Sequence, residues 1–140
     1  MFDAVLAMIG MVAAGQAPAE VAVDVGRANW EIYPQLPDTR MVPQPAQMVD
    51  ALAGILRNRQ CTLPGQDERN FDVVVRYIVL VNPDGTASRA VVNDVGCRPL
   101  ETLVGSLVVR LSGLRAFGPT GRSEARWYGG SFNFTHETFD

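Results

Sequence analysis

The sequence contains no lysine, one histidine and two cysteines, and these shortages exclude several classes of function. All 12 basic residues are arginines scattered along the chain, so no basic patch indicates nucleic-acid binding. The cysteines form no Cys-x-x-Cys pair, and with a single histidine they are too few for a standard zinc site. No glycine-rich loop follows a predicted strand, as phosphate binding would require. The net charge of −3 is mild and favours no charged partner.

The scarcity of histidine also argues against catalysis. A cysteine nucleophile needs a general base, and only Cys97 with His136 could supply the pair. Asp84, Asp94 and Glu101 have structural explanations at a turn, a strand end and a helix start, so no carboxylate pair indicates acid–base chemistry. A calcium site at the two aspartates would need several further oxygen ligands. We therefore expect no cofactor, no metal and no enzymatic activity.

Long hydrophobic runs are absent as well. The apolar stretch 4–14 is shorter than the roughly 20 residues of a membrane span, so we expect no permanent membrane anchor. Residues 1–19 instead predict a signal peptide, because Ala17-Pro18-Ala19 offers the small residues that a signal peptidase reads before Glu20. The segment before the apolar core has Asp3 and no basic residue, unlike typical leaders, and a short N-terminal helix is the alternative. The prediction is export to the periplasm.

The centre of the sequence predicts a β-hairpin. From Phe71 to Asn82 both alternating faces are apolar apart from the ends and Arg76, a pattern typical of an interior strand. The turn Asn82-Pro83-Asp84-Gly85 follows, in which proline presets φ and glycine accepts a positive φ. A weaker strand from Ala87 to Asp94 completes the hairpin and should lie near an edge of the sheet.

The two cysteines flank this hairpin. Cys61 precedes the first strand and Cys97 follows the second, so both lie at the same end of it. In an exported protein this arrangement indicates a disulfide. Closing the loop without strain would contribute about 3–4 kcal/mol to the free energy of unfolding. Two buried free thiols are the alternative.

Helices are predicted on both sides of the hairpin. Residues 45–59 carry a narrow apolar stripe, and from Pro99 to Leu114 leucine and valine recur at the three-and-four spacing of one helical face. A last strand, Ala125 to Thr135, alternates aromatic with small and polar residues, and Gly129-Gly130 within it indicates a bulge or a bend.

These elements predict an α+β domain over residues 45–136. Its three-stranded antiparallel sheet, in the order second, first, third, would pack against two helices. An extended, proline-containing arm (20–44), in which Val21 to Trp30 could form a short strand, would precede the domain, and a tail (137–140) would follow it.

The order of these features resembles the C-terminal domain family of TonB energy transducers. The matching residues are Pro83-Asp84-Gly85, Gly96, Leu100-Glu101, Phe117-x-Pro119, Gly121 and the strand from Trp127 to Phe134. The resemblance implies a periplasmic protein that binds an envelope protein, such as an outer-membrane receptor, through the edge of its last strand. The long proline-rich spacer of the transducers has no counterpart here, so we expect a role in binding or assembly rather than in energy transduction.

The partner-binding residues that follow from this resemblance lie on the last strand. Trp127 and Tyr128 would be the anchors, and the full predicted set is Arg126, Trp127, Tyr128, Phe132 and Phe134. An exposed edge strand would also permit a homodimer. The alternative is a small periplasmic ligand carrier or enzyme on the same scaffold, which a cavity lined by Arg76 and aromatic residues would favour.

Overall fold

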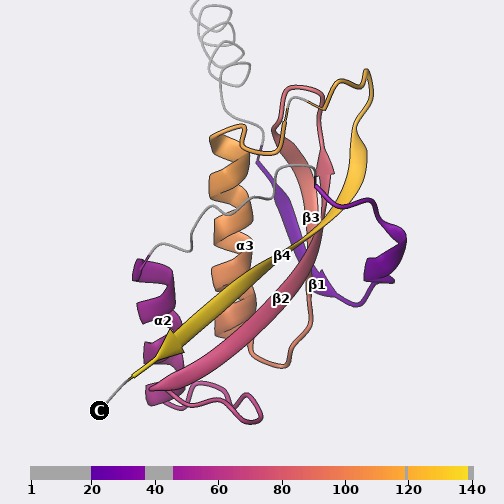
Figure 1. Ribbon diagram of the computed structural model, residues 1–140. Helices are drawn as coiled ribbons and strands as arrows, with labels where there is room; N and C mark the ends of the chain where they lie inside the picture. Colours follow the sequence, from indigo (N-terminus) through magenta and orange to yellow (C-terminus); the bar gives the residue numbers. More distant parts are fainter. Residues whose placement is uncertain (1–19, 37–45, 119, 139–140) are drawn as a thin grey trace, which may run out of the picture.

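Four strands form one mixed sheet in the computed structural model, which describes residues 20–36, 46–118 and 120–138 (Figure 1). The strands follow the order β1-β3-β2-β4 across the sheet. Their bounds are β1 Ala22–Gly26, β2 Asn70–Val81, β3 Ala87–Asn93 and β4 Arg126–Glu137. The helices are α2 Ala46–Arg57 and α3 Arg98–Gly113, with a 3₁₀ turn η1 at Trp30–Ile32. The α+β class is therefore as predicted.

The prediction of a three-stranded antiparallel sheet omitted one strand. The expected order second, first, third is present as β3-β2-β4, and both pairs are antiparallel. However, β1 adds a fourth strand parallel to β3, so the sheet is mixed and β3 is not an edge strand. The arm was hard to recognise as a strand because none of the β1 residues is buried. Val23 of β1 lies close to Gly105 of α3, where an added Cβ would be 3.1 Å from its Cγ1.

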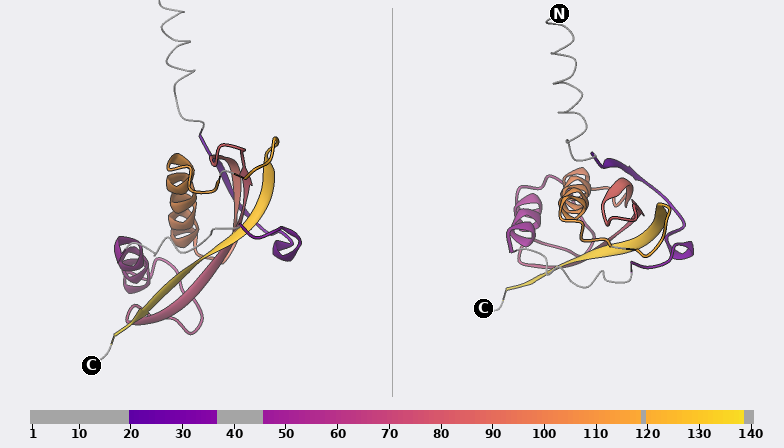
Figure 2. Two further views of the ribbon diagram at one scale, coloured as in Figure 1. Left: turned by 45° about the horizontal axis from the view of Figure 1, so that its top comes forward. Right: turned by 90° about the horizontal axis from the view of Figure 1, so that it is seen from above.

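The core lies between the sheet and the two helices, which cover the same face (Figure 2). β2 turns alternate residues toward the helices, and its two neighbours place their buried residues opposite them. The apolar stripe of α3 packs on this layer, and α2 packs beside it. The largest fully buried side chains are Tyr77, Phe134, Leu52, Leu100, Val75, Val79, Val81, Val92, Val104, Val108 and Cys97.

The predicted tight turn joins β2 to β3. The N–H of Gly85 donates to the carbonyl of Asn82 over 3.0 Å, and Gly85 has a φ of 89°. An added Cβ on Gly85 would lie 2.7 Å from the carbonyl oxygen of Arg115 and 2.9 Å from the nitrogen of Gly118. Glycine is therefore required both by the turn and by the segment after α3 that packs on it.

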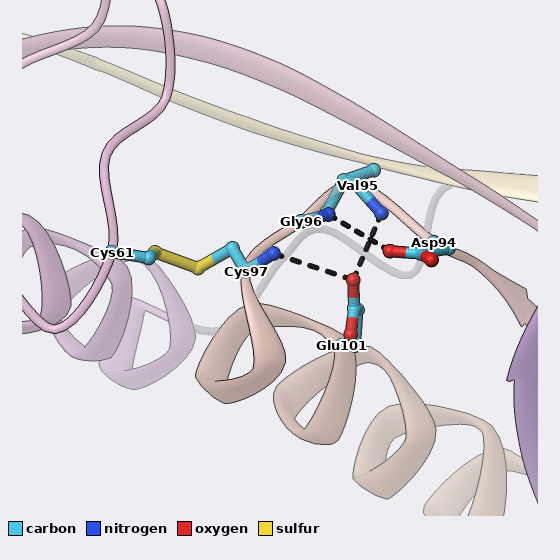
Figure 3. Close-up of a disulfide and its surroundings, with 6 residues drawn as sticks. All are labelled: Cys61, Asp94, Val95, Gly96, Cys97 and Glu101. Atoms are coloured by element: carbon cyan, nitrogen blue, oxygen red, sulfur yellow. Dashed lines mark hydrogen bonds between the residues drawn. A yellow bond between two sulfur atoms is a disulfide. The ribbon is translucent and has the colours of Figure 1, made fainter.

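A disulfide joins Cys61 to Cys97, with the sulfur atoms 1.95 Å apart and the Cα atoms 5.4 Å apart (Figure 3). The predicted pairing is therefore present, and it ties the loop after α2 to the start of α3. Glu101, only 6% exposed, orders the same region. Its carboxylate Oε2 accepts hydrogen bonds from the N–H of Val95 (2.8 Å) and of Cys97 (3.4 Å). The acidic residue in the first turn of α3 thus holds the strand-to-helix connection.

The last strand is longer than predicted. It continues to Glu137, two residues beyond the expected end at Thr135. Thr138 follows it and donates through its hydroxyl to the carbonyl of Arg69 over 3.0 Å. Part of the predicted tail is therefore held against the start of β2.

Two sequence predictions fall outside the described residues. These are the signal peptide at 1–19 and most of the proline-containing part of the arm, at 37–45. Among the helices in the described part of the chain, none is both long and apolar enough to cross a membrane.

Candidate functional site

Strand β4 forms one margin of the sheet and pairs with β2 along its whole length. The register runs without a shift from Asn70 opposite Glu137 to Val81 opposite Arg126. Of the two alternatives predicted at Gly129-Gly130, a bulge or a bend, the regular register excludes the bulge. The two glycines instead allow close packing on the two faces of the sheet, one on each.

Gly130 accommodates an aromatic ring on the helix-facing side. An added Cβ would lie 2.6 Å from both Cζ and the hydroxyl oxygen of Tyr77, which stands opposite on β2. The Tyr77 ring is 1% exposed and stacks on Phe132, with centroids 4.9 Å apart and planes inclined by 17°. Burial raises the pKa of the Tyr77 hydroxyl well above its ordinary value.

Gly129 accommodates the N-terminal arm on the other face. An added Cβ there would lie 3.2 Å from Nε2 of Gln35 and 3.7 Å from the carbonyl oxygen of Trp30. The arm starts beside β3 as β1, crosses this face through η1 and arrives at the outer edge of β4 (Figures 1 and 2). We call residues 27–36 the strap.

The strap ends as a short parallel addition to β4. The N–H of Leu36 donates to the carbonyl of Gly129 over 3.1 Å, and the N–H of Gly129 donates to the carbonyl of Pro34 over 2.9 Å. Gln35 is bridged in parallel with Gly129. The Leu36 side chain is 5% exposed and belongs to the core cluster. Just before these residues on the strap, Tyr33 lies near Trp127 of β4, with ring centroids 6.5 Å apart.

Beyond the strap, none of the described residues pairs with the outer edge of β4. Both backbone groups of Gly129 point away from β2, and backbone direction alternates along an antiparallel pair. Ser131, Asn133 and Thr135 therefore direct three N–H and three C=O groups outward. Within the described ranges no backbone group bonds to them. This stretch can accept another strand.

The exposed side chains along this open edge are small and polar. Thr135 donates to Oδ1 of Asp72 over 3.1 Å, and it also lies 3.0 Å from Oδ1 of Asn133. Natural edge strands are commonly protected by lysine, proline, a bulge or a covering element. From Ser131 to Thr135 the register is regular and the outward residues are uncharged, so the strand itself carries no lysine, proline or bulge, and no other part of the described chain bonds to its outward backbone.

A cleft of about 370 Å³ adjoins the edge where the strap meets it. Arg76 and Ser131 stand opposite each other on β2 and β4, and both line the cleft. Its remaining lining residues are Trp30, Glu31, Gln35, Tyr77, Gly129 and Gly130. Arg76, the one charge in the middle of β2, is exposed on the face away from the helices. The cleft thus combines an arginine, a carboxylate and an indole beside an open strand edge.

The residues predicted to bind a partner divide into two groups. Arg126 is exposed and Trp127 is half-buried, so both remain accessible. Tyr128, Phe132 and Phe134 are only 8%, 6% and 0% exposed, respectively. They face the helices and belong to the core, so this conformation does not present their side chains to a partner.

The outward backbone groups of β4 belong to the alternate residues of the strand, which the predicted partner-binding set did not include. Alternation already separated Ser131, Asn133 and Thr135 from the aromatic residues. The sequence prediction placed binding at the edge of the last strand but named its aromatic side chains, which are frequent at interfaces, rather than the backbone groups of the residues between them. The strap was also missed, because its contact with Gly129 is a long-range one.

The described residues show no arrangement for metal or nucleophilic chemistry. No group of three or more histidine, cysteine, aspartate or glutamate residues in the ranges 20–36, 46–118 and 120–138 could hold a metal ion. Cys97 is held in the disulfide, and the ring of His136 lies against Phe71 with centroids 5.5 Å apart.

No protein-family model, curated protein or solved structure matches this chain. The geometry of the edge therefore has to carry the functional argument.

Proposed function

We propose that the protein is an exported binding module that adds an extended segment of an envelope protein to the outer edge of β4. The observation that carries this proposal is the row of outward backbone groups at Ser131, Asn133 and Thr135. Strand addition uses such groups for affinity and alternate side-chain contacts for specificity. The envelope partner, for example an outer-membrane receptor, is the class implied by the resemblance to the TonB C-terminal domain.

The packing of the remaining surfaces supports this choice. The interface between helices and sheet is filled by the core cluster. Of the two margins of the sheet, β4 (Arg126–Glu137) offers a longer edge than β1 (Ala22–Gly26). Each new backbone hydrogen bond contributes about 0.5–1.5 kcal/mol net. A strand of a few residues would therefore bind weakly by its backbone alone, and Arg126, Trp127 and the cleft would have to add affinity.

The experiment compares Asn133→Pro with Asn133→Ala. Both changes remove the asparagine side chain, but only proline removes the outward N–H, and an edge position with its N–H toward solvent tolerates proline. Partner recovery by cross-linking in intact cells should survive in Asn133→Ala and fall by up to about tenfold in Asn133→Pro. Equal recovery with both variants would contradict strand addition at this edge.

Export is the second component of the proposal. The disulfide supports it, because disulfides persist in oxidising compartments. We expect the intact mass of the protein from its own cells, taken without reductant, to begin at Glu20 and to lack two hydrogens. A full-length chain with two free thiols would place the protein in a reducing compartment and refute export.

The cleft favours a second candidate function, the binding of a small ligand. Its volume of about 370 Å³ lies at the lower end of the range for ligand pockets, and Arg76 with Trp30 offers a cation and a ring. Native mass spectrometry of the purified protein would then show a bound molecule that Arg76→Ala abolishes. If Arg76→Ala loses the bound molecule but still recovers the envelope partner, the cleft binds a small ligand independently of strand addition at β4.

A further inference from the structure

Residues 34–36 lie on β4 in the way that a bound peptide lies on a receptor strand. They are extended, they run parallel to β4, and they exchange two main-chain hydrogen bonds with Gly129, of 2.9 and 3.1 Å. The side chains on either side of the bridge go to opposite faces. Gln35 lies over Gly129 on the face away from the helices, and Leu36 enters the core.

This contact has the two components of peptide recognition by a sheet edge. The backbone bonds define position and direction, and one buried side chain defines what fits. Leu36 is 5% exposed, whereas Pro34 and Gln35 beside it are exposed. Gly129 leaves room for this approach, because a Cβ there would lie 3.2 Å from Nε2 of Gln35, whose flexible end would have to shift.

The described contacts that hold this end of the strap include the two hydrogen bonds to Gly129, the burial of Leu36 and the ring contact between Tyr33 and Trp127. All of them are contacts that a peptide of similar sequence could make. The open edge at Ser131 begins two residues beyond Gly129, so an incoming strand could pair there first and then exchange with the strap.

We propose that residues 34–36 are a displaceable intramolecular ligand of β4, and that an extended peptide with a large apolar side chain in the position of Leu36 takes their place at Gly129. This inference rests on the proposed function, since it gives the same edge a built-in competitor and a preference for apolar residues. The competitor reduces the affinity of the edge for outside peptides to the intrinsic affinity multiplied by the fraction of time that the strap is released.

The test uses a synthetic peptide with the sequence of residues 29–37 as the probe. A matched peptide in which the residue at position 36 is aspartate is the control. Binding to the full, oxidised, isotope-labelled chain is followed by NMR at the backbone amides of Gly129 and Ser131. Wild type is compared with Leu36→Ala, which empties the buried position, and with Tyr33→Ala, which weakens the strap without changing the core.

We expect the probe to shift the Gly129 amide and to bind both variants about tenfold or more tightly than wild type, while the control peptide binds none of them. If Leu36→Ala fails to fold, Tyr33→Ala gives the same comparison. Equal affinity for wild type and Tyr33→Ala, shifts away from β4, or no binding to any folded chain would overturn the inference. Because the probe is a peptide of this chain, these outcomes are independent of whether Asn133→Pro loses an envelope partner.

Discussion

Replacing Gly130 with alanine tests the packing that places β4 against β2. On backbone grounds alone, Gly→Ala within a strand should stabilise the protein by roughly 0.5–1 kcal/mol. The new methyl group would, however, lie 2.6 Å from Cζ and the hydroxyl oxygen of Tyr77. That ring is 1% exposed and stacked on Phe132, so it cannot move aside without displacing the core. Overpacking of this kind destabilises by about 1–3 kcal/mol.

Gly129→Ala is the matched control, because it makes the same backbone change one residue earlier on the same strand. Its methyl group would meet the flexible end of Gln35 at 3.2 Å, which can shift. We expect Gly130→Ala to lower the free energy of unfolding by about 1–2 kcal/mol and Gly129→Ala to change it by less than about 0.5 kcal/mol. Urea denaturation of the oxidised proteins, followed by tryptophan fluorescence and circular dichroism, measures both values.

A double-mutant cycle identifies the cause. Tyr77→Leu removes the atoms that the methyl group would strike, so Gly130→Ala should be at least about 1 kcal/mol less harmful in that background. Equal stabilities of the two alanine variants, or a cycle without coupling, would refute the argument that Tyr77 requires a glycine opposite it.

Three further predictions concern stability. Replacing Cys61 and Cys97 together with serine should cost about 4 kcal/mol, from a disulfide that spans 36 positions, and denaturation of the variant measures it. Tyr77→Phe should leave urea stability unchanged or raise it by up to about 1 kcal/mol, because within the described residues the buried hydroxyl has no hydrogen-bond partner. Asp84 accepts hydrogen bonds from the hydroxyl (2.6 Å) and N–H (3.0 Å) of Thr86, which hold its pKa below the ordinary 3.8. The contribution of ionised Asp84 to the free energy of unfolding is thus complete above pH 3.8 and is lost as the pH falls below that value. In Asp84→Asn the free energy of unfolding should therefore fall less steeply with acidification.

Each of these predictions has a clear contrary result. Serine variants as stable as wild type would mean that the crosslink does little to the unfolded chain. A Tyr77→Phe protein weaker by more than 1 kcal/mol would indicate a partner for the hydroxyl, such as a buried water. An unchanged acid limb in Asp84→Asn would assign the pH dependence to other carboxylates, among them Asp67. The pKa of Asp67 is lowered by the N–H groups of Asn70 and Arg69.

The hairpin, the long helix and the disulfide could be predicted because each has a local cause. Pro83 and Gly85 define the turn, and the apolar spacing from Leu100 onward defines α3. The position of the cysteines at one end of the hairpin follows from the hairpin itself. The central place of β2 followed from its two apolar faces.

The arm could not be predicted in the same way. β1 has only half-buried and exposed residues, so it lacks the alternation that identifies a strand. Its pairing with β3 and the contact of the strap with Gly129 depend on residues far along the chain. For the predicted partner-binding set, residue type suggested Tyr128, Phe132 and Phe134, whereas the structure buries these side chains in the core and the outward backbone groups belong to the residues between them.

The strap has a consequence for the kinetics of folding. It links the beginning of the described chain to both margins of the sheet, and its last contact is with a strand near the C-terminus. Strands so distant in sequence lose much loop-closure entropy before their contacts can stabilise the pairing. Domains rich in such pairings therefore fold slowly. The sheet therefore cannot be completed until nearly the whole chain is present. Until then both margins of the sheet lack their final contacts.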